Sequence, residues 1–204
     1  ERLQMNIKDY IKVYDDVARP NLIDGFLQYC KNTEYKKAKI QKEMDDNSLN
    51  KIRNTDIHNI ARLETAPDQI SFDKYKNYTQ IHWSNILKNI IANTNMRYIH
   101  DMKFAYNPVT QIENTTLLRY RPGGHYVLHV DDCLKFHRVL SFIMFVNDDF
   151  EGGELIFGHC DHKEYMTIKP KKNRVVFFPS NFAYPHKVSP IKKGIRYTVV
   201  SWLN

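Results

Sequence analysis

The sequence predicts a mainly β fold of the α+β class, in which helices come first and short strands follow. Two observations predict it. Apolar residues recur at helical spacing up to about residue 95, and strand-like runs separated by Gly, Pro, Asn and Asp fill the chain after residue 112. The chain has 204 residues and is 42% hydrophobic, which is enough for one domain with a sizeable core. We therefore expect a single domain over residues 1–204.

Two segments of the first half carry the helical pattern. "RPNLIDGFLQYCKNT" (19–33) repeats apolar residues at i, i+3 and i+4 and has Pro20 near its start. "YTQIHWSNILKNIIANT" (78–94) repeats isoleucine and leucine in the same way. The stretch 42–56 between them is polar and lacks periodicity, so it predicts a mobile loop.

The second half carries eight short runs of β-prone residues. Turn signals such as Pro122-Gly123-Gly124 separate them. Strands of this length and number predict a sandwich, a barrel or a jelly roll. The runs are "TTLLRY" (115–120), "YVLHV" (126–130), "RVLSFIMFV" (138–146), "GELIF" (153–157), "EYMTIKP" (164–170), "NRVVFFP" (173–179), "YPHKVS" (184–189) and "IRYTVVSWL" (195–203).

Charge and cysteine content narrow the class of protein. The net charge is +7, but the lysines come in short groups and no RNA-recognition or zinc-finger motif accompanies them, which favours a solvated basic surface over a nucleic-acid-binding one. Three scattered cysteines without a CxxC pair predict a reducing compartment. No signal-peptide pattern and no apolar run near the roughly 20 residues of a membrane span are present. We expect a cytoplasmic protein without a membrane partner.

A possible metal site begins with His129 and Asp131 in "HYVLHVDD". Residues i and i+2 of a strand project from the same face, so these two side chains supply two ligands. His186 in "YPHKVSP" is the best candidate for the third ligand. Two histidines and one carboxylate form the facial triad of non-haem Fe(II) oxygenases, and zinc is the competing metal. Arg196, within an apolar strand pattern, needs an anionic partner if it points inward, and a dicarboxylate cosubstrate would provide one.

A family resemblance rests on five segments in order along residues 115–204. The chain resembles the Fe(II)/2-oxoglutarate dioxygenases of the prolyl 4-hydroxylase type, and residues 1–110 match only loosely. The segments are "LLRYRPGGHYVLHVDD", "RVLSFIMFVNDDFEGGELIF", "IKPKKNRVVFFPS", "PHKVSP" and "GIRYTVVSWL".

The resemblance implies an architecture and a set of cofactors. Residues 111–204 would form a double-stranded β-helix (jelly roll) catalytic core, and residues 1–110 would supply helical support and a substrate-covering loop. The low periodicity of 42–56 separately suggests that this stretch closes over the substrate as a lid. His129, Asp131 and His186 would be catalytic iron ligands. The reaction would use Fe(II), 2-oxoglutarate and O2, with ascorbate as a candidate reductant.

The resemblance also implies roles for four residues around the iron. Arg196 would bind the distal carboxylate of 2-oxoglutarate, and Tyr120 would donate its hydroxyl to the same carboxylate. Arg138 would lie at the mouth near the peptide substrate, and Trp202 would line the pocket beside the substrate proline. Ordinary structural roles stay open: an edge aromatic for Tyr120, a strand-end charge for Arg138 and a core tryptophan for Trp202.

Two departures from the family pattern leave the branch open. The collagen-type enzymes usually carry lysine at the position of Arg196. The hypoxia-factor enzymes carry arginine there, but they have a tyrosine where this chain has Phe145.

A second HxD, His159 and Asp161 within 159–162, is interpreted as a solvated turn because four ligands in four residues are too crowded for one site.

The predicted function is hydroxylation of prolyl residues in a peptide or protein, with succinate and CO2 as coproducts. Alternatives are a 2-oxoglutarate hydroxylase of a free amino acid or another side chain, a non-catalytic jelly-roll binding module and a zinc-containing cupin-like protein. A nucleic-acid demethylase is disfavoured, because that class has a second arginine six residues beyond the cosubstrate arginine, where this chain has Trp202. The sequence leaves the oligomeric state open.

Overall fold

The structure is a computed structural model that describes residues 6–39, 46–60, 74–109, 111–132, 137–159, 161 and 163–204. The helices among these residues are η1 (Ile7–Tyr10, a 3-10 helix), α1 (Pro20–Asn32), α2 (Asp46–Ile52) and α3 (Lys74–Asp101). The strands are β1 (Lys12–Tyr14), β2 (Lys36–Lys37), β3 (Arg53–Asn54), β4 (Asp56–Ile60), β5 (Thr115–Tyr120), β6 (His125–His129), β7 (Leu140–Phe145), β8 (Glu151–Gly152), β9 (Leu155–Gly158), β10 (Glu164–Ile168), β11 (Arg174–Pro179), β12 (His186–Val188), β13 (Ile191–Lys193) and β14 (Arg196–Leu203).

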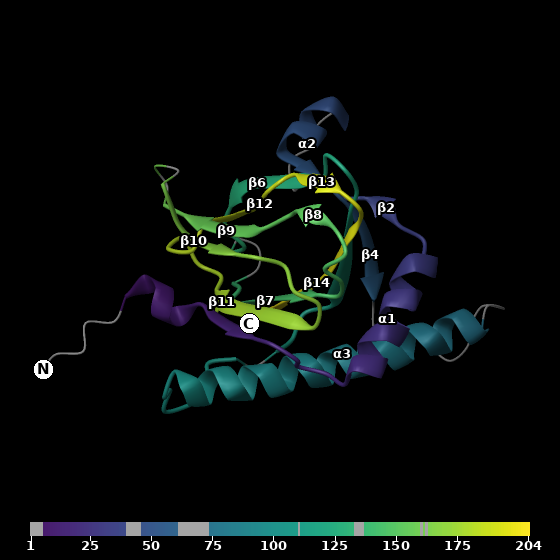
Figure 1. Ribbon diagram of the computed structural model, residues 1–204. Coiled ribbons are helices and arrows are strands. Elements are labelled where there is room, and N and C mark those ends of the chain that lie inside the picture. The colour runs from purple at the N-terminus through teal and green to yellow at the C-terminus, as the bar shows by residue number, and fades with distance from the viewer. Residues whose placement is uncertain are drawn as a thin grey trace, which may run out of the picture.

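The strands form two layers that face each other, with α1 and α3 outside the larger one (Figure 1). The larger sheet has the order β1-β11-β7-β14-β5-β4-β2, and the smaller has the order β10-β9-β12-β6-β3. A short pair, β13-β8, joins separately. All eight predicted strands are present, and the jelly-roll prediction is confirmed.

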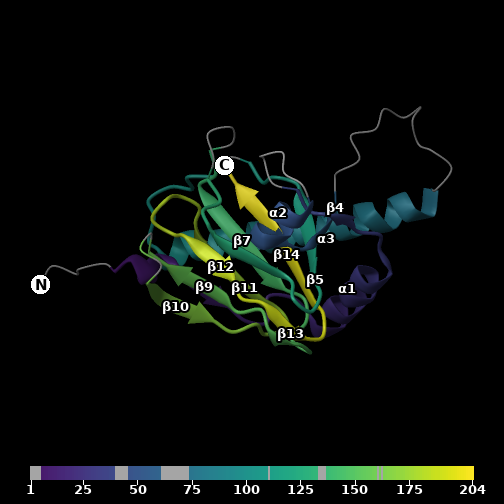
Figure 2. The ribbon, with the colours of Figure 1, turned by 90° about the horizontal axis from the view of Figure 1, so that it is seen from above.

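Alternation along the central strands of the larger sheet builds two cores. Phe142 and Met144 of β7 pack with α1 and α3, whereas Ile143 and Phe145 pack with the smaller sheet, because successive side chains of a strand point to opposite faces. Both faces of β7 are therefore buried, which explains why all its residues except Ser141 are apolar. Helix α3 runs beneath the strands in the view from above (Figure 2).

Both predicted helices are confirmed. Helix α1 begins after Arg19, whose backbone is extended, and has Pro20 at its first position, where the missing N–H costs nothing. Its buried face consists of Ile23, Phe26 and Cys30, at spacings of three and four residues. Cys30 is a free, buried cysteine; Cys133 and Cys160 lie outside the described residues.

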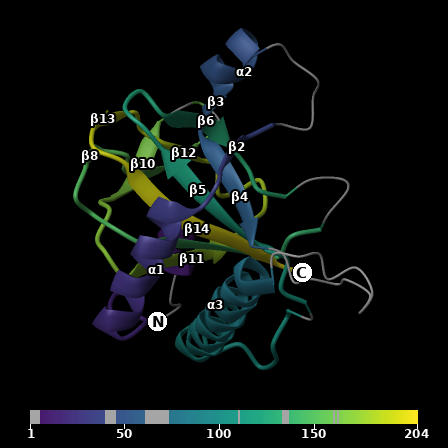
Figure 3. The ribbon, with the colours of Figure 1, turned by 90° about the vertical axis from the view of Figure 1, so that its right-hand side faces the viewer.

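The prediction of helix and loop before residue 110 is wrong in two places. Strands β1 to β4 also occur there, because β1 pairs with β11, β4 with β5 and β3 with β6. The predicted loop 42–56 contains α2 and β3, which lie at the edge of the smaller sheet, away from α3 (Figure 3). Residues 40–45 lie outside the described residues, and the lid stays a prediction.

The domain division also stays a prediction. Strands from both sides of residue 110 pair within the same sheets. None of the helices among the described residues combines the length and apolar character that crossing a membrane requires.

Candidate metal centre and cofactor pocket

The three predicted ligands converge at the edge where β6 meets β12. Strand β6 ends at His129, which lies opposite His186, the first residue of β12, in antiparallel register. Asp131 follows just after β6 rather than within it. The ligand atoms of the three side chains all lie within 4.8 Å of one another. Within the part of the chain that the structure describes, this is the one group of three such side chains that converges.

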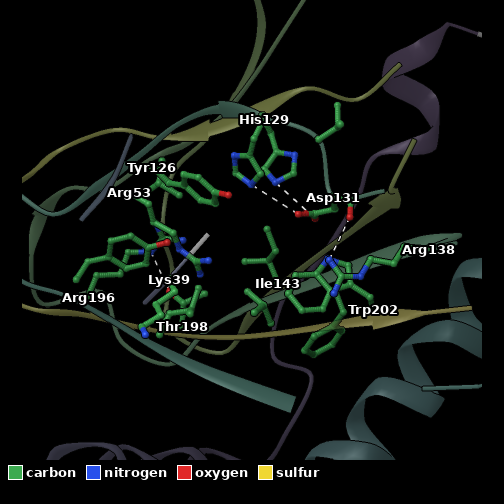
Figure 4. Close-up of a pocket in the computed structure, with 17 residues that line it drawn as sticks. Lys39, Arg53, Tyr126, His129, Asp131, Arg138, Ile143, Arg196, Thr198 and Trp202 are labelled. Carbon is green, nitrogen blue, oxygen red and sulfur yellow. Dashed lines mark hydrogen bonds and ion pairs between the residues drawn. The ribbon is translucent and has the colours of Figure 1, made fainter. Parts of the chain in front are cut away.

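The carboxylate lies between the two imidazoles. Nε2 of His129 is 3.6 Å from Oδ1 of Asp131, and Nε2 of His186 is 3.6 Å from Oδ2. Figure 4 shows His129 and Asp131 turned toward each other above the cavity. His186 is 3% exposed, so it lies on the interior side of the site.

Backbone carbonyls orient both rings for metal binding. Nδ1 of His129 lies 2.9 Å from the carbonyl oxygen of Val127, and Nδ1 of His186 lies 3.2 Å from that of Tyr184. A carbonyl can only accept, so each Nδ1 carries the proton and donates it. Each Nε2 then presents a lone pair toward Asp131, the arrangement that metal-binding histidines require.

The protonation states also suit a cation. Burial opposes ionisation of Asp131, but His186, His129 and the Ser141 hydroxyl outweigh it and hold the pKa of that carboxyl well below its usual range. Burial lowers the pKa of His186 to about 4. At neutral pH the site therefore offers one carboxylate and neutral imidazole, the donor set of a facial triad.

A serine pair behind Asp131 was missed by sequence reasoning. Oγ of Ser141 on β7 donates to Oδ2 of Asp131 over 2.7 Å and lies 2.8 Å from Oγ of Ser180. Because the single Ser141 proton goes to Asp131, Ser180 is the donor in the second contact. Both serines are buried. Serine in a β-run carries no local signal, so only the pairing of β7 with β11 could have identified them.

The ligands open onto a cavity of about 420 Å³ between the two sheets. The predicted residues Tyr120, Arg138, Arg196 and Trp202 all line it. Figure 4 shows the last three around the cavity. The full lining is Lys39, Arg53, Leu118, Tyr120, Tyr126, His129, Val130, Asp131, Arg138, Phe142, Ile143, His186, Val188, Arg196, Thr198, Val200 and Trp202.

Arg196 is a buried cation, and one of its hydrogen-bond donors has no partner in the described structure. Its side chain is 1% exposed; Nε donates to Thr198 over 2.9 Å, and Nη1 is buried with no hydrogen-bond partner in the described structure. The guanidinium lies 5.0 Å from the ring of Tyr120 and 4.9 Å from that of Phe145. Burial lowers the pKa of Arg196 to about 10, so it stays charged at neutral pH. A buried guanidinium without a described carboxylate partner fits the far carboxylate of a diacid.

Arg138 is held in a network beside the metal ligands. It forms a two-bond ion pair with Glu113, both bonds 2.9 Å long, and donates to the backbone carbonyl of Asp131 over 3.1 Å. Its guanidinium lies 3.6 Å from the ring of Trp202. The structure therefore places Arg138 and Trp202 together at the Asp131 end of the cavity. Substrate contact by either residue stays a prediction.

The second HxD lies elsewhere. His159 is exposed, and Asp161 pairs with Lys163 over 3.2 Å in a solvated segment. Cys160 and His162 lie outside the described residues.

The chain is similar in sequence and in fold to known proteins. Residues 115–204 match the model of the 2OG-Fe(II) oxygenase superfamily. In these residues, the chain is similar to that superfamily. That superfamily uses Fe(II), 2-oxoglutarate and O2, and the donor set and the unpartnered Arg196 of this chain fit them.

Similar proteins include hydroxylases from animals and bacteria. The chain is 44% identical over 90 residues to prolyl 3-hydroxylase 2 of Homo sapiens; the matched region covers 37% of this chain and 13% of that protein. It is 27% identical over 139 residues to the PKHD-type hydroxylase IL0759 of Idiomarina loihiensis, covering 66% and 57%. Its fold is similar to that of a Pseudomonas putida prolyl-4-hydroxylase (TM-score 0.67, 16% identity, 96% and 92% covered). The chain thus spans just over half of the bacterial relative and a small part of the human one.

Proposed function

We propose that this protein is a 2-oxoglutarate-dependent dioxygenase that hydroxylates prolyl residues of a peptide or protein. The observation that carries the proposal is the convergence of His129, Asp131 and His186 in the same cavity as the unpartnered guanidinium of Arg196. One end of the cavity suits Fe(II) and the other suits the distal carboxylate of 2-oxoglutarate. The names of the similar hydroxylases support proline as the target.

The chain's own residues would bind and orient the reactants. The two histidines and Asp131 would hold Fe(II) on one face and leave the opposite face open to the cavity. Arg196 would fix the far end of 2-oxoglutarate, and Tyr120, which is 1% exposed beside it, would add a hydroxyl donor. When bound, Fe(II) would activate O2, the oxidant, whose two oxygen atoms would go one to 2-oxoglutarate, giving succinate and CO2, and one to the hydroxylated prolyl residue.

The apolar lining would keep water away from the reacting groups. Leu118, Ile143, Val188 and Val200 surround the cavity from both sheets. They exclude water from the space between the ligands and Arg196, which strengthens charge interactions there. Ascorbate as the reductant and the cytoplasm as the compartment belong to the same proposal.

The decisive test is incubation with Fe(II), 2-oxoglutarate, ascorbate and a panel of proline-containing peptides, followed by mass spectrometry. We expect a gain of one oxygen on proline, and fragmentation with amino-acid analysis would separate 3- from 4-hydroxyproline. His129→Ala should abolish turnover in a folded protein, whereas His159→Ala, which removes an exposed histidine outside the cavity, should not. Succinate formation without any proline oxidation would overturn the choice of substrate.

A further inference from the structure

The cavity contains two cations that the proposed function does not use. They are Lys39 and Arg53, which line the cavity together with Arg196 and Arg138. Asp131 is the one carboxylate among the described lining residues. A lining with four cations and one carboxylate creates a strong positive potential in a low-dielectric space, which favours anionic ligands.

When the opposite charges in the cavity are matched, the positive charges of Lys39 and Arg53 are not balanced by any described side chain. Fe(II) with Asp131, and 2-oxoglutarate with Arg196, together sum to zero charge. Arg138 is neutralised by Glu113. No carboxylate lies within ion-pair distance of Lys39 or Arg53 among the side chains that the structure describes. The cavity therefore holds an excess of two positive charges once the proposed reactants are bound.

Arg53 also has an unmet hydrogen-bonding need. Its Nε is buried and has no hydrogen-bond partner in the described structure. A buried guanidinium donor that stays unpaired is costly, and an incoming acceptor would remove that cost. Arg53 thus resembles Arg196: both present a buried, unpartnered guanidinium nitrogen at the same cavity.

The position of Arg53 is fixed relative to the metal centre. Strand β3 pairs with β6, with Arg53 opposite Tyr126. The guanidinium lies 4.8 Å from the Tyr126 ring, and that ring stacks on His129 at 3.6 Å between centroids. Figure 4 shows Arg53 and Tyr126 on the side of the cavity opposite Arg138. Only the Tyr126 ring would therefore lie between a ligand group on Arg53 and the proposed iron ligand His129.

Exposure separates this pair of cations from the cosubstrate arginine. Arg196 is fully buried at the floor, Arg53 is partly buried, and Lys39 is exposed. The floor position suits the small cosubstrate that must bind first and deep. The rim position suits a chain that passes across the mouth.

We propose that Arg53 and Lys39 form a second anion subsite, which binds the carboxylate of an aspartate or glutamate near the target proline of an acidic peptide segment. The proposal rests on the proposed function and adds the substrate class. The net charge of +7 favours the same acidic partners over longer range. The fork of Arg53 can grip the carboxylate while Lys39 adds a point charge at the mouth.

The test compares binding of matched peptides, independently of turnover. Fluorescent proline peptides carrying Glu or Gln at successive flanking positions would be titrated by anisotropy against protein loaded with Mn(II) and the unreactive analogue N-oxalylglycine. We expect the best Glu peptide to bind about tenfold more tightly than its Gln twin, as one partly buried charge-assisted pair allows. Arg53→Gln should reduce this preference to about twofold or less, and Lys39→Gln should reduce it in part.

Matched controls separate the subsite from general charge. Lys51→Gln removes an exposed cation two residues from Arg53 and outside the cavity, so it should leave the preference unchanged. Arg53→Lys should keep part of it. Circular dichroism would check folding, and if Arg53→Gln does not fold, Lys39→Gln at an exposed position carries the test.

Each failure has its own signature. Equal binding of Glu and Gln peptides to the wild-type protein would overturn the subsite. An Arg53→Gln variant that loses affinity for N-oxalylglycine while keeping the peptide preference would assign Arg53 to the cosubstrate and also overturn it. Preferential binding of acidic peptides without proline oxidation would refute the proposed function and leave the subsite standing, whereas oxidation without acid preference would do the reverse.

Discussion

Replacing Ser141 by alanine should weaken metal binding although Ser141 is not a predicted ligand. Its hydroxyl donates to Oδ2 of Asp131 over 2.7 Å and receives the proton of Ser180. The substitution removes the donor to a buried carboxylate and leaves the Ser180 proton without this acceptor. The carboxylate would then be free to rotate away from the two imidazoles.

The magnitude follows from the kind of hydrogen bond that is lost. A bond to a charged group contributes about 1.5–3 kcal/mol, and loss of an outer contact to a metal ligand typically lowers affinity about 10- to 100-fold. The two figures agree, since each factor of ten is about 1.4 kcal/mol. We therefore expect the Mn(II) dissociation constant of Ser141→Ala to rise by about 10- to 100-fold.

Calorimetric titration of the apoprotein with Mn(II) measures this directly. Ser201→Ala is the matched control, because Ser201 is an equally buried sheet serine whose hydroxyl donates to the backbone carbonyl of Glu113 instead. That variant should bind Mn(II) as the wild type does. A folded Ser141→Ala protein with an affinity within twofold of the wild type would refute the positioning role.

Three further predictions concern the charged groups. Arg196→Gln should raise the KM for 2-oxoglutarate by at least about tenfold in a succinate assay, since it removes the buried cation from the cavity floor; an unchanged KM would contradict this. Glu113→Gln should lower the free energy of urea-induced unfolding by about 1–2 kcal/mol, because it leaves the partly buried Arg138 without its anion; no loss would show that the pair is merely solvated. Asp15 has its pKa lowered to about 2, chiefly by the hydrogen bond from Arg174, so its contribution is present above pH 4 and lost as the pH falls toward 2. Asp15→Asn should therefore destabilise the protein by up to about 1 kcal/mol at neutral pH and by progressively less in acid, and a difference that does not change with pH would exclude this linkage.

The strands could be predicted because their signal is local. Segment 140–145 is apolar except for Ser141, since both its faces are buried, and runs such as 115–120 are bounded by clear turn residues. Strand β4 (Asp56–Ile60) could not be predicted, because only Ile60 is buried and its pairing with β5 comes from a distant part of the chain. Strand formation there is decided by tertiary contacts.

The same distinction applies to the site. The spacing of His129 and Asp131 is visible in the sequence, but the approach of His186 depends on β12 pairing with β6. Ser141 and Arg53 are ordinary residue types in ordinary runs. They acquire their significance only when sheet register places one against a carboxylate and the other over Tyr126.

The most direct test of the central claim is anomalous diffraction from crystals of the protein loaded with Mn(II) and 2-oxoglutarate. We predict a single strong metal peak bound by Nε2 of His129, a carboxylate oxygen of Asp131 and Nε2 of His186, with the far carboxylate of 2-oxoglutarate on Arg196. A metal peak at another place, or a well-ordered 2-oxoglutarate that does not contact Arg196, would contradict the account.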